Sequence, residues 1–203
     1  LSPANAPGVV QEKPRGQSAA FREHYEQIGT THTDVFESAI REPRFQMVEG
    51  WLRAHPTVRR VLDFGCAHGS YAVGLSNAVG RQWVGVDIDK HSIDWAEKFR
   101  TTKAKDPDAL RFVVGDETVD LSGQEPFDLL FLGETLEHVS EPWRVMDALE
   151  RWVKPGGFVL ITVPYGPWEY LSYDTYPYRA HLWEYDAHDL RDLFGQKANL
   201  TVR

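Results

Sequence analysis

Two short stretches of the chain carry residue types that could bind a ligand. The first is DFGCAHG at 63–69, in which Asp63 precedes the glycines Gly65 and Gly69. Glycines between a strand and a helix give a tight turn whose backbone a ligand can approach closely. Asp87 ends the next apolar segment, where a carboxylate can accept both hydroxyls of a ribose. The pattern predicts a site for a nucleotide-like ligand rather than a plain strand–turn–helix corner.

The second stretch is ETLEH at 134–138, which combines carboxylates with an imidazole. Together with His181 it offers Glu134, Glu137 and His138, a set of donors suited to Mg²⁺, Mn²⁺ or Zn²⁺. Short motifs of this kind also arise without a metal, so no metal is favoured here. If a metal is bound, these four residues are the expected ligands.

A third stretch, YGPWEYLSYDTYPYRAHLWEYD at 165–186, is rich in Trp and Tyr. Pro167, Pro177 and Gly166 forbid one long helix. Large rings offer contact area at low entropic cost, and tyrosine hydroxyls add directional hydrogen bonds. We expect some rings to pack this segment onto the body of the protein and others to form a lid over a substrate.

Alternating strand and helix patterns position these stretches. Near-continuous apolar runs predict strands at 59–65, 82–89, 111–116, 127–133, 158–164 and 198–203. Amphipathic patterns predict helices at 18–28, 34–54 (interrupted near Pro43), 70–79, 90–100, 141–153 and 186–194, with a KPGG turn at 154–157. This order predicts an α/β protein with a Rossmann-like, doubly wound, mostly parallel sheet and helices on both faces. A ligand site is then expected at the carboxyl ends of the strands.

Composition narrows the class of protein. The 203 residues carry a formal net charge of −8, which opposes nucleic-acid or anionic-membrane binding. No apolar run approaches the ~20 residues that a membrane span needs. Cys66 is the single cysteine, so a reducing cytoplasm is the expected location. The first residues, 1–17, have the composition of a linker.

The loop after the first strand distinguishes between nucleotide ligands. A dinucleotide motif G-x-G-x-x-G beginning at Gly65 needs glycine where the chain has Ala67 and Ser70. VLDFGCAHG instead resembles the first motif, D-x-G-x-G-x-G, of class I S-adenosylmethionine-dependent methyltransferases, with Ala67 in place of the middle glycine. An acidic residue at the position of Asp63 suits the cationic end of a sulfonium amino acid and opposes a pyrophosphate.

The resemblance continues over roughly residues 50–200. VGVDID and VVGDE are similar to the second and third motifs of the family. FDLLFLGETLEHV and LERWVKPGGFVLITVP resemble the branch that contains ubiquinone-biosynthesis-type and related small-molecule methyltransferases. The order and spacing of these motifs carry the assignment, because none of them is specific alone.

The resemblance implies S-adenosyl-L-methionine as the cofactor and methyl transfer to a small-molecule or saccharide hydroxyl as the reaction. The implied cofactor-binding residues are Asp63, Gly65, Cys66, Ala67, Gly69, Asp87, Ile88, Asp116, Glu117 and Glu134. His138, just past the fourth strand, is the candidate general base for the acceptor hydroxyl, and a role in shaping the loop is its alternative. The expected acceptor-binding residues are Tyr165, Tyr170, Tyr178, His181 and Trp183.

Two other functions stay open from sequence. ETLEH with His181-Leu-Trp-Glu-Tyr is similar to the metal-dependent small-RNA 2′-O-methyltransferases of the Hen1 type, although the acidic charge opposes an RNA substrate. The chain could also be a non-catalytic methyltransferase-like domain of a multidomain glycan-modifying protein, with covalently linked neighbouring domains.

The expected organisation is a linker at 1–17, an N-terminal helical cap at 18–56 and a class I methyltransferase domain at 57–203, cut from a longer polypeptide. The antiparallel unit that usually ends the family's sheet is expected to be truncated at ANLTVR, 198–203.

Overall fold

The computed structural model describes residues 32–165 and 181–195. These residues fall into two compact units. The sheet unit contains residues 32–133 and 151–161, and the ETLEH unit contains residues 134–150, 162–165 and 181–195. The predicted linker at 1–17, the helix at 18–28 and the truncated strand at 198–203 lie outside the described residues.

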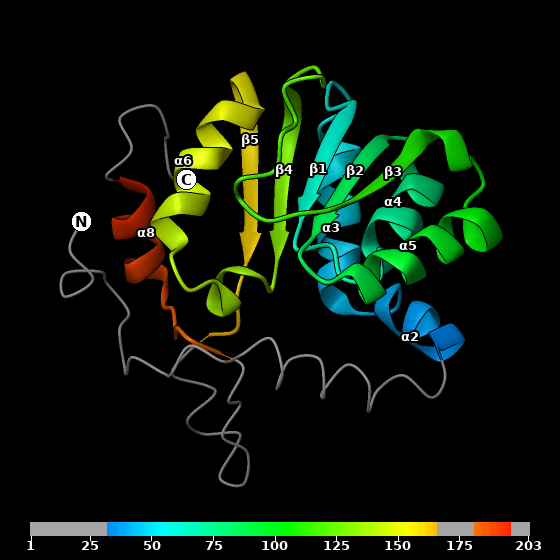
Figure 1. Cartoon of the computed structure of the whole chain (residues 1–203), viewed down its shortest axis with the longest axis horizontal. Coiled ribbons are helices and arrows are strands. Elements are labelled where there is room, and N and C mark those ends of the chain that lie inside the picture. The colour runs from blue at the N-terminus through cyan, green and yellow to red at the C-terminus, as the bar shows by residue number, and fades with distance from the viewer. Residues whose placement is uncertain (1–31, 166–180, 196–203) are drawn as a thin grey trace, which may run out of the picture. The chain divides into compact units, whose positions relative to one another are not determined.

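The sheet unit is built on five strands in the order β3-β2-β1-β4-β5 (Figure 1). The strands are β1 (Arg60–Phe64), β2 (Gln82–Asp87), β3 (Leu110–Val114), β4 (Phe127–Gly133) and β5 (Val153–Thr162). β1 pairs in parallel with β2 and β4, and β2 pairs in parallel with β3. The chain winds outward from β1 to β3 and then returns to the other side of β1. This reversal makes a switch point between β1 and β4, where ligands bind in folds of this class.

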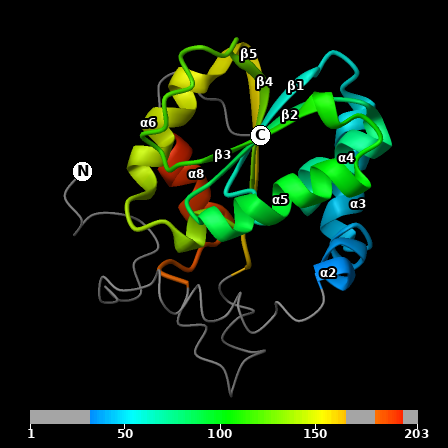
Figure 2. The same ribbon diagram turned by 45° about the vertical axis from the view of Figure 1, so that its right-hand side comes forward.

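Helices alternate with the strands as expected. They are α2 (His32–Ala39), α3 (Pro43–Ala54), α4 (Ser70–Val79), α5 (Lys90–Lys103), α6 (Pro142–Trp152) and α8 (Ala187–Gly195). Short 3₁₀ turns, η2 (Pro107–Ala109) and η3 (Leu136–His138), precede β3 and follow β4. In Figure 2, α3, α4 and α5 lie together on one side of the strands. The predicted Rossmann-like, doubly wound class is confirmed.

The core of the sheet unit lies between the strands and these helices. Trp83, Leu62, Leu75 and Phe131 are almost fully buried. Phe36 of α2 meets Phe99 of α5 edge to face, with ring centroids 5.3 Å apart. Burial of these large apolar side chains is the main favourable term that holds the helices on the sheet.

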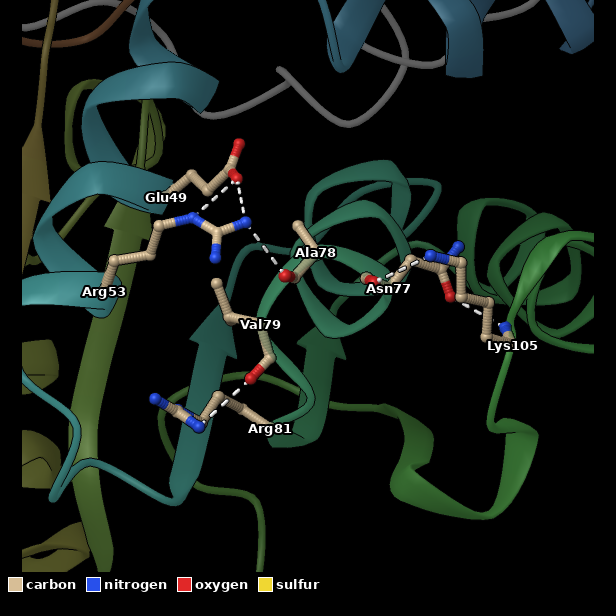
Figure 3. A network of polar contacts seen from close by, with 7 residues as sticks. All are labelled: Glu49, Arg53, Asn77, Ala78, Val79, Arg81 and Lys105. Carbon is tan, nitrogen blue, oxygen red and sulfur yellow. Dashed lines mark hydrogen bonds and ion pairs between the residues drawn. The ribbon is translucent and has the colours of Figure 1, made fainter.

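Basic side chains satisfy the carboxyl end of α4 (Figure 3). Arg53 of α3 donates to the carbonyl of Ala78 at 3.0 Å, and Arg81 donates to the carbonyl of Val79 at 3.0 Å. The last carbonyls of a helix lack partners within the helix and carry partial negative charge, so cations are favourable there. These contacts hold α4 in place, and the amino end of α4 directly follows the predicted cofactor loop.

Several element boundaries differ from the sequence-based expectation. The KPGG segment at 154–157 belongs to β5, which begins directly after α6, although the segment was predicted to be a turn. Gly156 still has a φ of +75°, so the segment bends inside the strand. The second and third strands end at Asp87 and Val114, each two residues earlier than predicted, because the chain turns there. Among the described residues, no helix combines the length and apolarity needed to cross a membrane.

Candidate active site

Most predicted cofactor residues gather at one edge of the sheet unit. Asp63 lies near the end of β1, Asp87 ends β2, and Asp116 follows β3. These three strands are neighbours in the sheet, so their carboxyl ends meet at the same edge. Gly65, Cys66, Ala67 and Gly69 form the loop between β1 and α4.

The loop after β1 repeatedly enters the left-handed region of backbone space. Gly65, Ala67 and Gly69 have φ values of +77°, +45° and +69°. A Cβ atom on Gly69 would lie 2.8 Å from the ring of Phe112 and 2.9 Å from Ala96, so only glycine fits at this position. Ala67 is not a glycine, and it carries a strained conformation in the middle of the loop.

Asp87 ties this loop to the second strand. One of its oxygens, Oδ2, accepts the amide of Ala67 at 2.8 Å, and Oδ1 accepts the amide of Asp89 at 2.9 Å. Because an ionised carboxylate has about four lone-pair positions, Asp87 keeps capacity for two ribose hydroxyls. Burial raises the pKa of Asp87, and the two backbone amides oppose that shift.

Asp63 is a second acid at this edge whose pKa is raised. Its side chain is 2% exposed, and Oδ2 has no hydrogen-bond partner among the described residues. Burial raises the pKa of Asp63 to about 8, the charge of Asp87 adds to the rise, and Arg44 opposes it. A buried carboxyl with an unsatisfied oxygen fits a ligand that brings N–H donors or a positive charge. The residues present therefore suit the amino-acid end of S-adenosylmethionine.

The residues predicted to lie beside the adenine differ in how far their side chains are engaged within the protein. Ile88 directly follows β2 and is 71% exposed, so its side chain is open to a ring placed beside it. The carboxylate of Asp116 instead accepts from Thr118, from the hydroxyl at 2.6 Å and the amide at 2.8 Å. These bonds lower the pKa of Asp116 and hold its own loop. The carbonyl of the neighbouring Glu117 accepts a hydrogen bond from Arg151 at 3.2 Å.

Sequence reasoning missed a polar group that reaches the same edge from α3 and α4. Arg44 donates to the hydroxyl of Tyr71 at 2.9 Å, and that hydroxyl donates to Glu42 at 2.6 Å. The positive charge of Arg44 acts on Asp63 and opposes the rise of its pKa. No motif marks this contact, because Arg44 belongs to the helices before the first strand.

The ETLEH unit holds the remaining predicted residues. Glu134 has a φ of +53°, and its amide donates to the carbonyl of Thr162 at 2.9 Å. Glu137 and His138 end the 3₁₀ turn η3, and Glu137 is 1% exposed. Of the four ligands named for a possible metal, Glu137, His138 and His181 come together, with donor atoms all within 4.8 Å of one another. Glu134 is not a member of this group.

His181 and Trp183 lie against the ETLEH turn. The imidazole rings of His138 and His181 have centroids 4.7 Å apart at an angle of 70°. The indole N–H of Trp183 donates to the carbonyl of Val139 at 2.6 Å, so this donor is engaged within the protein. Tyr165 is 50% exposed and forms a parallel bridge with Tyr185. Tyr170 and Tyr178, the other predicted acceptor residues, lie outside the described residues.

Comparison with known proteins agrees with this geometry. Residues 37–203 match the family model described as a methyltransferase domain. The chain therefore belongs to the methyltransferase domain family, and the predicted class of S-adenosylmethionine-dependent methyltransferases is confirmed.

Similar curated proteins include an O-methyltransferase and a rifamycin-type methyltransferase. The chain is 34% identical over 114 residues to the ubiquinone biosynthesis O-methyltransferase of Alkalilimnicola ehrlichii, a match that covers 56% of this chain and 45% of that protein. It is 28% identical over 113 residues to the 27-O-demethylrifamycin SV methyltransferase of Amycolatopsis mediterranei, covering 53% and 41%. The chain thus spans less than half the length of these relatives.

Solved structures show the same fold. The plantazolicin methyltransferase BpumL, solved in complex with SAH, superposes with a TM-score of 0.64 at 13% identity and covers 89% of this chain and 78% of that one. The YcgJ protein of Bacillus subtilis superposes with a TM-score of 0.60 at 22% identity, covering 74% and 67%. The relatives described here give no support to the RNA 2′-O-methyltransferase alternative.

Proposed function

We propose that this chain transfers a methyl group from S-adenosyl-L-methionine to a hydroxyl of a small-molecule or saccharide acceptor. The observation that carries the proposal is the pair of buried carboxyls, Asp63 and Asp87, on either side of the left-handed loop at 65–69. The named activities of the relatives from Alkalilimnicola ehrlichii and Amycolatopsis mediterranei support an O-linked acceptor.

The cofactor, when bound, supplies a methyl group on a positively charged sulfur. In the proposed site Asp63 faces the cationic amino-acid end, and Asp87 accepts from the ribose hydroxyls. The loop amides of 65–69 approach the ligand closely because two of the loop positions are glycines. Holding acceptor and methyl group in line can contribute roughly 7–11 kcal/mol to lowering the barrier.

The bound cofactor would supply its methyl carbon to the acceptor oxygen, and its sulfur would keep the electron pair of the broken carbon–sulfur bond. The hydroxyl proton must leave during this step. His138 is the base named from sequence, and this role stays a prediction, as do the acceptor roles of Tyr165, Tyr170, Tyr178, His181 and Trp183. The cytoplasmic location and the division at residues 17 and 56 also stay predictions.

Calorimetric titration tests the proposal. Wild-type protein is expected to bind S-adenosylmethionine and its demethylated product, and not a nicotinamide dinucleotide. Asp87→Asn should weaken binding of the product about 10–100-fold, since it removes a charged acceptor of two hydrogen bonds. Asp108→Asn, the same change at an exposed residue of η2, is the matched control and should bind like wild type.

Turnover is measured as methyl transfer to a panel of phenols and saccharides. Failure of the folded wild-type protein to bind either sulfur compound would overturn the proposal. Binding without transfer to any hydroxyl acceptor would contradict the O-methyltransferase activity and favour a non-catalytic domain.

A further inference from the structure

The ETLEH unit contains a compact cluster of three side chains with metal-binding chemistry. Glu137 and His138 are adjacent in η3, and His181 arrives from a segment more than forty residues away. One donor atom from each residue lies within 4.8 Å of the other two. Nε2 of His138 is 3.9 Å from Oε1 of Glu137. Metal bonds of about 2.0–2.2 Å put two ligands of one ion no more than about 4.4 Å apart, so a shift of less than about 1 Å closes the set.

The backbone holds the two halves of this cluster together. The carbonyl of Glu137 accepts the amides of both Leu182 and Trp183, at 2.7 and 3.2 Å. The side chain of Trp183 adds its bond to Val139, and its ring meets Trp143 edge to face with centroids 6.3 Å apart. The three side chains are thus carried by two segments bonded to each other at the cluster. Preorganised backbone of this kind is what a precise ligand site requires.

Two members of the cluster are buried. Glu137 is 1% exposed and His181 is 8% exposed. Attraction between a cation and a carboxylate is stronger where water is excluded than at the surface. A divalent ion held by the carboxylate and the two imidazoles would bind in such an environment.

We infer that Glu137, His138 and His181 form a binding site for one divalent transition-metal cation of the Zn²⁺ or Mn²⁺ kind. Two nitrogen donors favour such ions over Mg²⁺ or Ca²⁺, which prefer oxygen. Three protein ligands leave at least one position open, as in catalytic zinc sites with two histidines and one glutamate.

This inference rests on the proposed function and extends it to the acceptor. A hydroxyl oxygen at the open position would lose its proton to solvent more readily, because the cation withdraws electron density from it. The lone pair of His138 is then used in a metal bond, so His138 acts as a ligand and not as the general base named from sequence. Acceptors with two adjacent oxygens, such as catechols and vicinal diols, are the class that this arrangement favours.

The experiment is metal titration of the chelator-treated protein with Zn²⁺, and with Co²⁺ as a spectroscopic probe. Wild type should bind one equivalent of Zn²⁺ and give the visible absorption of Co²⁺ bound to nitrogen and oxygen. His181→Ala and Glu137→Gln should each weaken binding at least tenfold. His188→Ala is the matched control, because His188 is an exposed histidine of α8 paired with Asp192 at 3.4 Å, and it should bind like wild type.

Circular dichroism and titration with S-adenosylhomocysteine are recorded on the same samples. Glu137→Gln is nearly isosteric, so it keeps the test valid if His181→Ala does not fold. The inference is overturned if wild type binds none of the tested ions, or if folded Glu137→Gln binds them as tightly as wild type. Wild-type protein that binds S-adenosylhomocysteine but no metal would contradict this inference alone. Wild-type protein that does not bind S-adenosylhomocysteine would contradict the proposed function.

Discussion

At the scale of single residues, the candidate cofactor loop depends on backbone conformations that side chains rarely adopt. Gly69 has no room for a Cβ atom, because Phe112 and Ala96 would meet it within 3 Å. Ala67 adopts the same left-handed region with a φ of +45°, although its amide is well used by Asp87. Its Cβ atom therefore strains the loop.

Ala67→Gly is expected to stabilise the protein. The left-handed conformation costs an L-residue roughly 1–2 kcal/mol, and the added freedom of glycine in the unfolded chain removes about 0.5–1 kcal/mol of the gain. The net effect should raise the free energy of unfolding by up to about 1.5 kcal/mol, measured by urea denaturation. Ala72→Gly, inside α4 and fully buried, is the control and should destabilise the protein. A less stable Ala67→Gly protein would contradict the strain.

At the scale of elements, α4 is held at its carboxyl end by polar contacts. Its amino end opens the loop beside Asp63, and its carboxyl end is satisfied by Arg53, Arg81 and Gly80. Asn77 links this end to the segment after α5, since its Nδ2 donates to the carbonyl of Lys103 at 2.9 Å and its Oδ1 accepts the amide of Lys105 at 2.7 Å. These hydrogen bonds join the carboxyl end of α4 to the carboxyl end of α5.

Asn77→Ala should lower the free energy of unfolding by about 1–2 kcal/mol, because it removes one donor and one acceptor from a partly buried position. Lys105→Ala is the comparison: it removes only the 3.2 Å bond from the exposed Lys105 side chain to the carbonyl of Asn77 and should cost less than about 0.5 kcal/mol. Chemical denaturation of both variants measures the two values. Equal losses would mean that Asn77 does not link the two helices.

At the scale of the whole molecule, the buried acid Asp63 makes stability depend on pH. Its pKa is raised to about 8 by burial, with a further contribution from the charge of Asp87, against an ordinary value of 3.8. The protonated form is favoured in the folded state, so the stabilising contribution is complete below pH 3.8. It is lost progressively as the pH rises through about 8. The ligand-free protein should therefore be less stable at pH 9 than at pH 6.

Asp63→Asn removes this titration. The loss of stability between pH 6 and pH 9, measured as the free energy of unfolding at each pH, should be smaller in the variant than in wild type. Cofactor binding should also weaken, because the amide cannot carry the charge that faces the ligand. Parallel pH profiles of the two proteins would show that Asp63 is already ionised in the fold.

The sequence by itself determined the order of strands and helices and the residues of the first loop. Those features depend on local patterns: apolar runs for buried strands, glycine spacing for a turn, and a carboxylate at the end of the next strand. The helix at Ser70–Val79 and the strand at Phe127–Gly133 have the predicted limits for this reason. The prediction was wrong for the KPGG segment, which has the composition of a turn and yet forms part of β5.

Only the tertiary structure decided which distant side chains meet. Arg44 acts on Asp63 across the helices that precede the first strand, and no spacing in the sequence signals that contact. The sequence offered four residues for a possible metal, and the fold brings three of them together while Glu134 takes a separate left-handed position. The acceptor role predicted for Trp183 stays a prediction, and the fold adds a bond from its indole N–H to the carbonyl of Val139 that the sequence did not signal. The physical reason is that these contacts depend on backbone hydrogen bonds between segments far apart in the chain, whose path no local pattern of residues specifies.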